Sequence, residues 1–214
     1  MNLMNKGFFV TFEGVEGAGK STQIKIMKKY LGKKGWPIVT TREPGGTFIG
    51  DELRDILLDV DNKDIDPKVE ALLYAASRAQ LVSNVIKPAL EEKKVVLSDR
   101  YIDSSLAYQG YGRGLPIDAI LDFNKWATSA LQPDLTFLFR LPAEQGLART
   151  STKHADRIES ESISFHKKVE KGYDELAASY KDRYHVIDAT KTTEQVTQEI
   201  KAVIDNMLAA VTVK

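Results

Sequence analysis

The stretch Gly14-Val-Glu-Gly-Ala-Gly-Lys-Ser21 (GVEGAGKS) decides how the rest of the chain is interpreted. It satisfies the pattern G-x-x-x-x-G-K-[ST], in which glycines let the backbone curl until successive N–H groups point at phosphate oxygens. An apolar, β-rich run at Gly7–Phe12 precedes it, and a helical spacing of Ile24, Met27 and Leu31 follows. This order of strand, loop and helix predicts a phosphate-binding P-loop at a helix N-terminus.

The loop and one strand end together predict a site for ATP with Mg²⁺. Lys20 supplies a point charge to the outer phosphates, and the Ser21 hydroxyl is suited to ligate magnesium. A strand that ends at Asp99 predicts a carboxylate that holds the magnesium shell through water, although many strands end in Asp as a turn residue. The predicted ATP contacts in this stretch are Gly14, Val15, Glu16, Gly17, Ala18, Gly19, Lys20, Ser21 and Thr22.

Strand and helix patterns alternate along the rest of the chain. Further strands are predicted at Pro37–Thr41, Val95–Leu97, Leu135–Leu141 and Tyr184–Ile187, and helices over Lys20–Lys34, Gly50–Leu58 and Pro67–Glu92. Thr192–Gln195 fits a capping box before an apolar stripe of Val196, Ile200, Val203, Met207 and Val211. The alternation predicts an α/β fold of three layers, in which a five-stranded parallel sheet is flanked by helices. Such a sheet binds ligands at the carboxyl ends of its strands.

Composition bounds the remaining choices. With 214 residues, the chain is expected to form a single domain over 1–214, with a lid at approximately 149–160. The polar run Thr150–Asp156 is the part of this lid most suited to flexibility. Thirty basic and 30 acidic residues balance, so nothing supports a large nucleic-acid or membrane footprint. The chain has no cysteine and no apolar run of about 18 residues, so we expect a cytoplasmic protein without disulfides or a membrane span.

The motifs favour a small kinase over other P-loop proteins. A guanine-nucleotide switch needs N-K-x-D and D-x-x-G, but Asn124–Ala127 fails the first and the second does not occur. A small kinase must hold two anions in line, which requires arginines on the acceptor side and a lid that excludes water. Arg42 and Arg100 follow strands and suit that role, whereas for Arg78, inside a long helix, an ion pair is equally expected.

Several motifs together resemble the bacterial thymidylate kinases, which belong to the P-loop nucleoside monophosphate kinases. The matching stretches are Phe12–Ser21 (FEGVEGAGKS), Thr41–Gly46 (TREPGG), Tyr74–Arg78 (YAASR), Asp99–Gln109 (DRYIDSSLAYQ) and Pro133–Thr136 (PDLT). The resemblance runs from about Gly7 to the C-terminal helix. It implies transfer of the γ-phosphoryl group of ATP to dTMP, giving dTDP for dTTP synthesis, by a homodimer.

The resemblance also implies roles for individual residues. Tyr74 matches an aromatic residue that stacks on thymine, with plain core packing as the alternative; Arg78, Ser105 and Gln109 match groups that contact the base, and Tyr108 lies near the sugar. Arg42 and Arg100 match a clamp on the acceptor phosphate, Arg54 reaches the same pocket, Pro44 follows a peptide bond that is often cis, and Arg149 packs on adenine. The implied catalytic residues are Lys20, Arg100, Arg157, Glu16 and Asp99.

Two positions in the loop sharpen this comparison. Some members of the family carry a catalytic arginine where this chain has Gly17, so the resemblance points to the class whose lid supplies the arginine. Arg149, Lys153 and Arg157 are the lid cations, and we favour Arg157 while Lys153 stays open. Glu16 matches an acid that reaches the acceptor sugar near its 3′-hydroxyl, with a side chain pointing into water as the alternative. Glu13 is assigned to the strand end.

Two other functions remain open on the sequence alone. The first is another small P-loop kinase that phosphorylates a different nucleoside monophosphate or a hydroxyl acid. The second is a nucleotide-dependent regulatory module without transfer activity. The intact set of Lys20, Ser21, Asp99, Arg42 and Arg100 argues against the second.

Overall fold

A five-stranded parallel sheet forms the centre of the computed structural model, which describes residues 6–150 and 155–211. The strand order is β2-β3-β1-β4-β5. The strands are β1 (Phe8–Gly14), β2 (Ile38–Arg42), β3 (Val95–Asp99), β4 (Leu135–Arg140) and β5 (Tyr184–Asp188). All five strands that the sequence predicts are therefore present, within one or two residues of their predicted ends.

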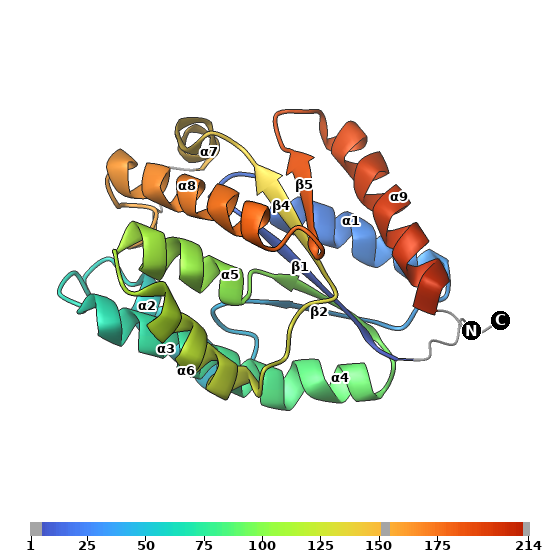
Figure 1. The fold of residues 1–214 in the computed structure, drawn as a ribbon, viewed down its shortest axis with the longest axis horizontal. Coiled ribbons are helices and arrows are strands. Elements are labelled where there is room, and N and C mark those ends of the chain that lie inside the picture. Colours follow the sequence, from blue (N-terminus) through green and yellow to red (C-terminus); the bar gives the residue numbers. More distant parts are fainter. Residues whose placement is uncertain (1–5, 151–154, 212–214) are drawn as a thin grey trace.

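Helices cover both faces of the sheet, as Figure 1 shows. On one face α1 (Lys20–Lys33) and α9 (Thr193–Val211) enclose an apolar cluster that includes Phe12, Met27 and Ile200. The remaining described helices are α2 (Phe48–Leu58), α3 (Pro67–Leu81), η1 (Val82–Ile86), α4 (Lys87–Glu91), α5 (Ile102–Ser105), η2 (Leu106–Gly112), α6 (Ile117–Thr128), α7 (Ala143–Arg149) and α8 (Ile163–Ser179). They lie on the other face, except α7, which lies beyond the carboxyl end of β4 beside the P-loop. This arrangement is the predicted three-layer α/β fold.

The register of the inner strands brings the predicted site residues to one edge. Phe12 of β1 is paired with Asp99 of β3, and Asp99 is paired with Arg42 of β2. Because parallel strands end at the same edge, the P-loop, Asp99 and Arg42 emerge side by side. All seven residues of β1 are buried, which explains its continuous apolar run.

The predicted helix over Pro67–Glu92 is interrupted by a π-helical segment. The Lys87 N–H donates to the Val82 carbonyl, five residues back, and α4 continues from Lys87. Pro88 lacks an N–H and its ring crowds the preceding turn, so a widened turn relieves a clash that a regular helix would create. The uninterrupted α-helix that the sequence predicts is therefore wrong at this turn.

The C-terminal helix confirms its predicted start but not all of its stripe. The Thr192 N–H donates to Gln195 Oε1 and the Gln195 N–H donates to Thr192 Oγ1, which is the reciprocal pair of a capping box. Ile204 and Leu208 are the buried residues of the later turns, while Val203 and Met207 are only partly buried. The side chain of Val211 lies outside the described residues. Within the described ranges, no helix has the length and apolar character to cross a membrane.

Candidate active site

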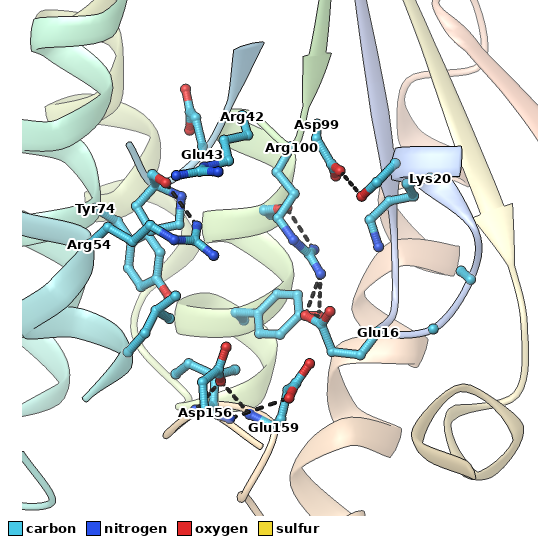
Figure 2. A pocket seen from close by; sticks show the side chains of 18 of the residues that line it. Glu16, Lys20, Arg42, Glu43, Arg54, Tyr74, Asp99, Arg100, Asp156 and Glu159 are labelled. Carbon is cyan, nitrogen blue, oxygen red and sulfur yellow. Dashed lines mark hydrogen bonds and ion pairs between the residues drawn. The ribbon is translucent and has the colours of Figure 1, made fainter. Parts of the chain in front are cut away.

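A cavity of about 550 Å³ opens at the carboxyl edge of the sheet. Figure 2 shows Arg42, Arg54 and Arg100 reaching into it beside Tyr74, with Glu16 and Lys20 on the P-loop side. Most of the predicted residues line this cavity: Glu16, Gly17, Ala18, Gly19, Lys20, Ser21, Thr22, Arg42, Pro44, Arg54, Tyr74, Asp99, Arg100, Ser105, Tyr108, Gln109 and Arg149. Four predicted residues, Gly14, Val15, Arg78 and Arg157, are not among those that line it.

The P-loop is shaped by glycines and closed by its lysine. Gly14, Gly17 and Gly19 all have positive φ, a conformation that other residues adopt only with strain. Lys20 Nζ donates to the carbonyls of Gly14 at 3.0 Å and Val15 at 2.8 Å, so its ammonium sits against the loop at the cavity wall. Burial, and then the nearby Arg100, lower the pKa of Lys20. The loop therefore presents a nearly buried cation where phosphates are expected.

The predicted magnesium ligands lie next to each other. Ser21 Oγ donates to Asp99 Oδ2 at 2.5 Å, which joins the start of α1 to the end of β3. Mg²⁺ takes oxygen ligands and keeps several waters, so a hydroxyl, a carboxylate and substrate phosphates form a suitable set. The described part of the chain has no cluster of three or more His, Cys, Asp or Glu side chains that could hold a metal alone. The residues fit an ion that arrives with the nucleotide.

Arg100 is the centre of the hydrogen-bond network on the acceptor side. Its guanidinium donates to the Gly14 carbonyl and to the hydroxyls of Ser104, Tyr173 and Tyr108, each at 3.1 Å, and it forms an ion pair with Glu16. Burial alone would lower the pKa of Arg100, but Glu16, Tyr108, Tyr173 and Asp99 together outweigh burial and raise the pKa well above its ordinary value. The network therefore holds a permanent positive charge in one orientation.

The backbone of Arg100 is unusual for a residue with a side chain. Its φ is +74°, in the left-handed region. The Arg100 N–H donates to the Phe12 carbonyl at 3.0 Å, and Ser98 Oγ donates to the Arg100 carbonyl at 2.8 Å. These contacts hold a conformation that costs about 1–3 kcal/mol and is typical of functional positions.

Glu16 points into the site, so the alternative that it points into water is wrong. It accepts from Arg100 and, at 3.1 Å, from the Tyr108 hydroxyl. Burial alone would raise the pKa of Glu16, but Arg100 and then Lys20 bring it below its ordinary value. Arg100 therefore compensates the charge of this carboxylate.

Glu13 is a site residue that the sequence analysis treated only as a strand end. It is fully buried and accepts from the Tyr101 N–H at 2.7 Å, from Ser104 Oγ at 2.6 Å and from the Tyr173 hydroxyl at 3.0 Å. Burial, and then Asp103, raise the pKa of Glu13 to about 7. Ser104 and Tyr173 donate to Glu13 and also accept from Arg100. Glu13 therefore fixes the position of the Arg100 guanidinium through these two hydroxyl groups. Its place directly before the loop was the only signal available in the sequence.

The predicted acceptor-phosphate residues converge as expected. Arg42 lies on the cavity wall with its side chain 60% exposed and only a long 3.5 Å contact to Asp51. Arg54 Nη1 donates to the Pro44 carbonyl at 2.9 Å, and the Glu43–Pro44 peptide bond is cis, as the resemblance implied. Burial, and then Arg42, lower the pKa of Arg54. Neighbouring guanidinium groups that crowd one another in this way form a suitable site for an anion.

Arg78 does not lie where its predicted role needs it. The side chain is 1% exposed and its five N–H donors are all occupied. They go to Glu43 (from Nε and Nη2), Ser105, Asn124 and the Tyr101 carbonyl. The direct contact with a base carbonyl is therefore corrected: Arg78 supports Glu43 and Ser105, which line the cavity. Tyr74 is half-buried on the cavity wall, not plain core.

Arg157 is also placed differently from the prediction. Its side chain is 8% exposed; Nη1 pairs with Glu70 at 2.7 Å and Nε donates to the Leu57 carbonyl at 2.8 Å. It is absent from the cavity wall, although its neighbours Asp156 and Glu159 line it. A guanidinium anchored between α2 and α3 does not reach a phosphate in this arrangement. Lys153, the other candidate, lies outside the described residues.

Of the two lid cations within the described ranges, Arg149 is the one that lines the cavity. It lines the main cavity and also a neighbouring hollow of about 90 Å³ beside Lys191 and Thr193. Its Nη1 donates to the Ala189 carbonyl at 3.2 Å. This position, at the outer side of the P-loop, is compatible with the predicted packing on a nucleotide base.

Gly17 and Gly146 meet backbone to backbone. A Cβ built on Gly17 would lie 2.2 Å from the Gly146 carbonyl oxygen, and one on Gly146 would lie 2.3 Å from the Glu16 carbonyl oxygen. A side chain at position 17 therefore requires α7 to move away from the P-loop. The packing of α7 explains why this loop has glycine where some related loops have arginine.

Comparison with known proteins gives a consistent result. The family model described as "Thymidylate kinase" matches residues 12–200. A thymidylate kinase from Halothermothrix orenii is 50% identical over 199 residues, 91% of this chain and 95% of that protein. One from Bacillus velezensis is 45% identical over 205 residues, 94% of this chain and 97% of that protein. The crystal structure of thymidylate kinase from Ehrlichia chaffeensis matches with a TM-score of 0.76 and 31% identity, covering 92% of this chain and 98% of that one.

Proposed function

Because this chain belongs to the thymidylate kinase family, we propose that its cavity holds dTMP and ATP end to end, with the P-loop on the donor side and three arginines on the acceptor side. The chain is a kinase that phosphorylates dTMP to dTDP, with ATP as the donor. The single observation that supports this division of the cavity is the Glu16–Arg100 pair, which joins the P-loop to the end of β3.

On the donor side, the P-loop amides and Lys20 bind the β- and γ-phosphates. Ser21 and, through water, Asp99 would hold a Mg²⁺ ion, which would supply charge neutralisation for the transferring phosphoryl group. Arg149 packs against the adenine at the neighbouring hollow. Lys20 Nζ donates hydrogen bonds to the Gly14 and Val15 carbonyls. When ATP binds, the ammonium group exchanges these hydrogen bonds for bonds to phosphate oxygens.

On the acceptor side, Arg42, Arg54 and Arg100 bind the dTMP phosphate and place one of its oxygens in line with the γ-phosphorus. Tyr74 stacks on thymine, and Ser105 and Gln109 contact its edge. Tyr108 and Glu16 lie beside the sugar, where the Glu16 carboxylate accepts from the 3′-hydroxyl. Holding two anions against fixed cations in a cavity with little water accounts for most of the catalysis in such a transfer.

The lid remains the source of the last cation in this proposal. Gly17 cannot carry an arginine without displacing α7, so the transferring group is neutralised by Lys20 and by a cation of the lid. Arg149 lines the cavity, whereas Arg157 is held by Glu70. Variants of Arg149, Lys153 and Arg157, compared by kcat at saturating substrates, identify the lid cation.

We further propose a homodimer formed by the exposed apolar residues of three adjacent helices. Large apolar side chains on α2, α3 and α6 are exposed, and α3 packs against both other helices. They are Phe48 (78% exposed), Ile49, Ile56, Val69, Leu72 and Trp126 (86% exposed). Apolar residues gathered on neighbouring helices are typical of a protein interface. Sedimentation tests this proposal: the wild type should be a dimer, and Trp126→Ser should shift it towards the monomer.

A cytoplasmic location stays a prediction.

The assignment of the acceptor side is tested by kinetics with a matched control. Arg100→Lys keeps the charge but loses the fork that reaches five acceptors, so kcat/KM for dTMP should fall by at least about 100-fold with little change in the KM for ATP. Arg140→Lys is the control, because the Arg140 side chain is 53% exposed and its ion pair within the described part of the chain is with Asp174 on the surface. Faster phosphorylation of AMP or GMP than of dTMP, dUMP and dCMP would contradict the assignment of dTMP as the acceptor.

A further inference from the structure

Glu70 is a buried carboxylate beside the cavity that the reaction itself does not use. It lies on α3, has no exposed surface and is not part of the cavity wall. Four N–H donors meet it: Gln109 Nε2 at 2.9 Å, Arg113 Nε at 3.1 Å and Nη2 at 3.0 Å, and Arg157 Nη1 at 2.7 Å. Glu70 therefore connects α3 to η2, to the turn after η2 and to the lid segment.

The chemistry of these groups fixes which end of the Gln109 amide faces Glu70. Arg113 and Arg157 are permanent cations that only donate, so they keep the carboxylate ionised. Burial alone would raise the pKa of Glu70, but the hydrogen bonds from Arg113 and Gln109 bring it below its ordinary value. An ionised carboxylate only accepts, so the end of the Gln109 amide that faces it must be the NH₂ group.

The other end of the amide is then presented to the cavity. Gln109 lines the cavity, and among the described residues its Oε1 has no hydrogen-bond partner. A 180° turn of the amide would place Oε1 against the Glu70 carboxylate, where two acceptors repel. The amide is locked with its acceptor available for a ligand.

We propose that Glu70 is a specificity-positioning residue, which holds the Gln109 amide so that Oε1 accepts from the N3–H of thymine and excludes cytosine. Thymine carries a donor at N3, whereas cytosine carries a lone pair there that would face Oε1. A free amide would turn to suit either base, but the amide held by Glu70 does not. The inference rests on the proposed placement of the thymine beside Gln109.

The discrimination between dTMP and dCMP measures this effect. Glu70→Gln replaces an obligate acceptor by an amide that both donates and accepts, so Gln109 is free to turn. The ratio of kcat/KM for dTMP to that for dCMP should fall by about ten- to a hundredfold, the factor for one unpaired buried polar group. Most of the loss should appear as a higher KM for dTMP. If dCMP turnover is too slow to measure, its inhibition constant against dTMP replaces it.

Arg113→Gln is the matched control, because it removes two of the four donors to Glu70 but leaves the Gln109 contact in place. Its dTMP/dCMP ratio should stay within about twofold of the wild type. If Glu70→Gln does not fold, Glu70→Gln combined with Arg157→Met removes the uncompensated cation, and is compared with Arg157→Met alone.

Gln109→Met separates failure of this inference from failure of the proposed site. If Gln109→Met lowers the dTMP/dCMP ratio while Glu70→Gln leaves it unchanged, the base lies at Gln109 but Glu70 does not position it. If Gln109→Met changes neither this ratio nor the KM for dTMP, the base lies elsewhere and the placement of dTMP is wrong. Equal losses for both nucleotides in Glu70→Gln would mean that Glu70 has only a structural role, which also overturns the inference.

Discussion

Glu16 in the P-loop and Arg100 after β3, 84 residues apart in the chain, form an ion pair in the wall of the cavity. The pair resolves the apparent contradiction of an acid within a loop that binds phosphates. The carboxylate pairs with Arg100, on the side of the cavity proposed for the acceptor, whereas Lys20 Nζ lies against the Gly14 and Val15 carbonyls of the loop. In the proposed arrangement of the substrates, one short loop therefore contacts both of them.

Replacing Glu16 by Gln should impair the use of dTMP more than the use of ATP. A charge-assisted hydrogen bond to Arg100 is worth about 1.5–3 kcal/mol, so kcat/KM for dTMP should fall roughly ten- to a hundredfold. The KM for ATP should change little. Steady-state kinetics with each substrate varied in turn provide the measurement. An unchanged KM and kcat for dTMP would disprove a role at the sugar.

Gly17→Ala should destabilise the protein more than Gly19→Ala. Both glycines have positive φ, +68° and +91°, so both substitutions carry a similar backbone strain of about 1 kcal/mol. Only the Cβ at position 17 meets backbone, at 2.2 Å, whereas nothing lies within 4 Å at position 19. Free energies of unfolding from urea titrations give the difference. Equal losses would show that α7 moves away without cost.

Arg157→Ala should lower stability rather than catalysis. The variant leaves Glu70 with fewer donors, and breaking a buried pair costs about 3–5 kcal/mol. We expect kcat to fall by less than about tenfold, with a clear drop in melting temperature. A loss of about 10³-fold in kcat, typical of an arginine finger, would mean that Arg157 leaves Glu70 when the substrates bind. Lys153→Ala, assayed in parallel, shows whether the other lid cation carries that effect.

Glu13 should make stability fall as the pH rises through neutrality. Its pKa is 4.5 as a free side chain and about 7 in the folded protein, so the folded state holds the proton more tightly. The stabilising contribution is complete below about pH 4.5 and is lost as the pH passes about 7. Unfolding free energies from pH 5 to 8 should therefore decline less steeply for Glu13→Gln than for the wild type. If the unfolding free energies of the two proteins fall equally steeply with pH, Glu13 is not the group that causes this loss of stability.

Tyr108→Phe should retain the preference for deoxyribose while losing activity. The ring lines the cavity, so its bulk still excludes a 2′-hydroxyl. The lost hydroxyl contacts Glu16 and Arg100 at 3.1 Å each, so kcat/KM should fall by roughly tenfold, as expected for a hydrogen bond to charged groups. Rates with dTMP and its ribo analogue provide the test. Equal rates on the two in this variant would show that the hydroxyl, not the bulk, selects the sugar.

Local patterns were enough to predict the framework of the site. The five strands, the P-loop and the pairing of Ser21 with Asp99 follow from apolar runs, from glycine spacing and from residues at strand ends. Each of these signals involves neighbours in sequence, and parallel strands necessarily align their carboxyl ends. The arginines at strand ends, Arg42 and Arg100, were found for the same reason.

The residues that the sequence placed wrongly all lie on helices or in the lid. Arg78 and Arg157 carry the positive charge that the predicted roles need, and they lie close to the cavity. Their guanidinium groups form ion pairs with Glu43 and Glu70, so they do not face a ligand. Glu13 and Glu70 were missed because an acid looks the same in sequence whether it faces solvent or, as here, buried hydroxyl groups in one case and guanidinium groups in the other. A guanidinium pairs with whichever carboxylate the packing of separate elements brings within reach.

The sequence by itself determined the fold class, the phosphate-binding loop and the family, because those depend on short motifs whose geometry is local. Only the tertiary structure decided which charged groups face the cavity and which face one another. Burial makes an unpaired charge costly, so the buried carboxylates and guanidinium groups around the cavity take partners from other elements. Those pairings, Glu16 with Arg100 and Glu70 with Gln109, are set by distances across the fold that no motif contains.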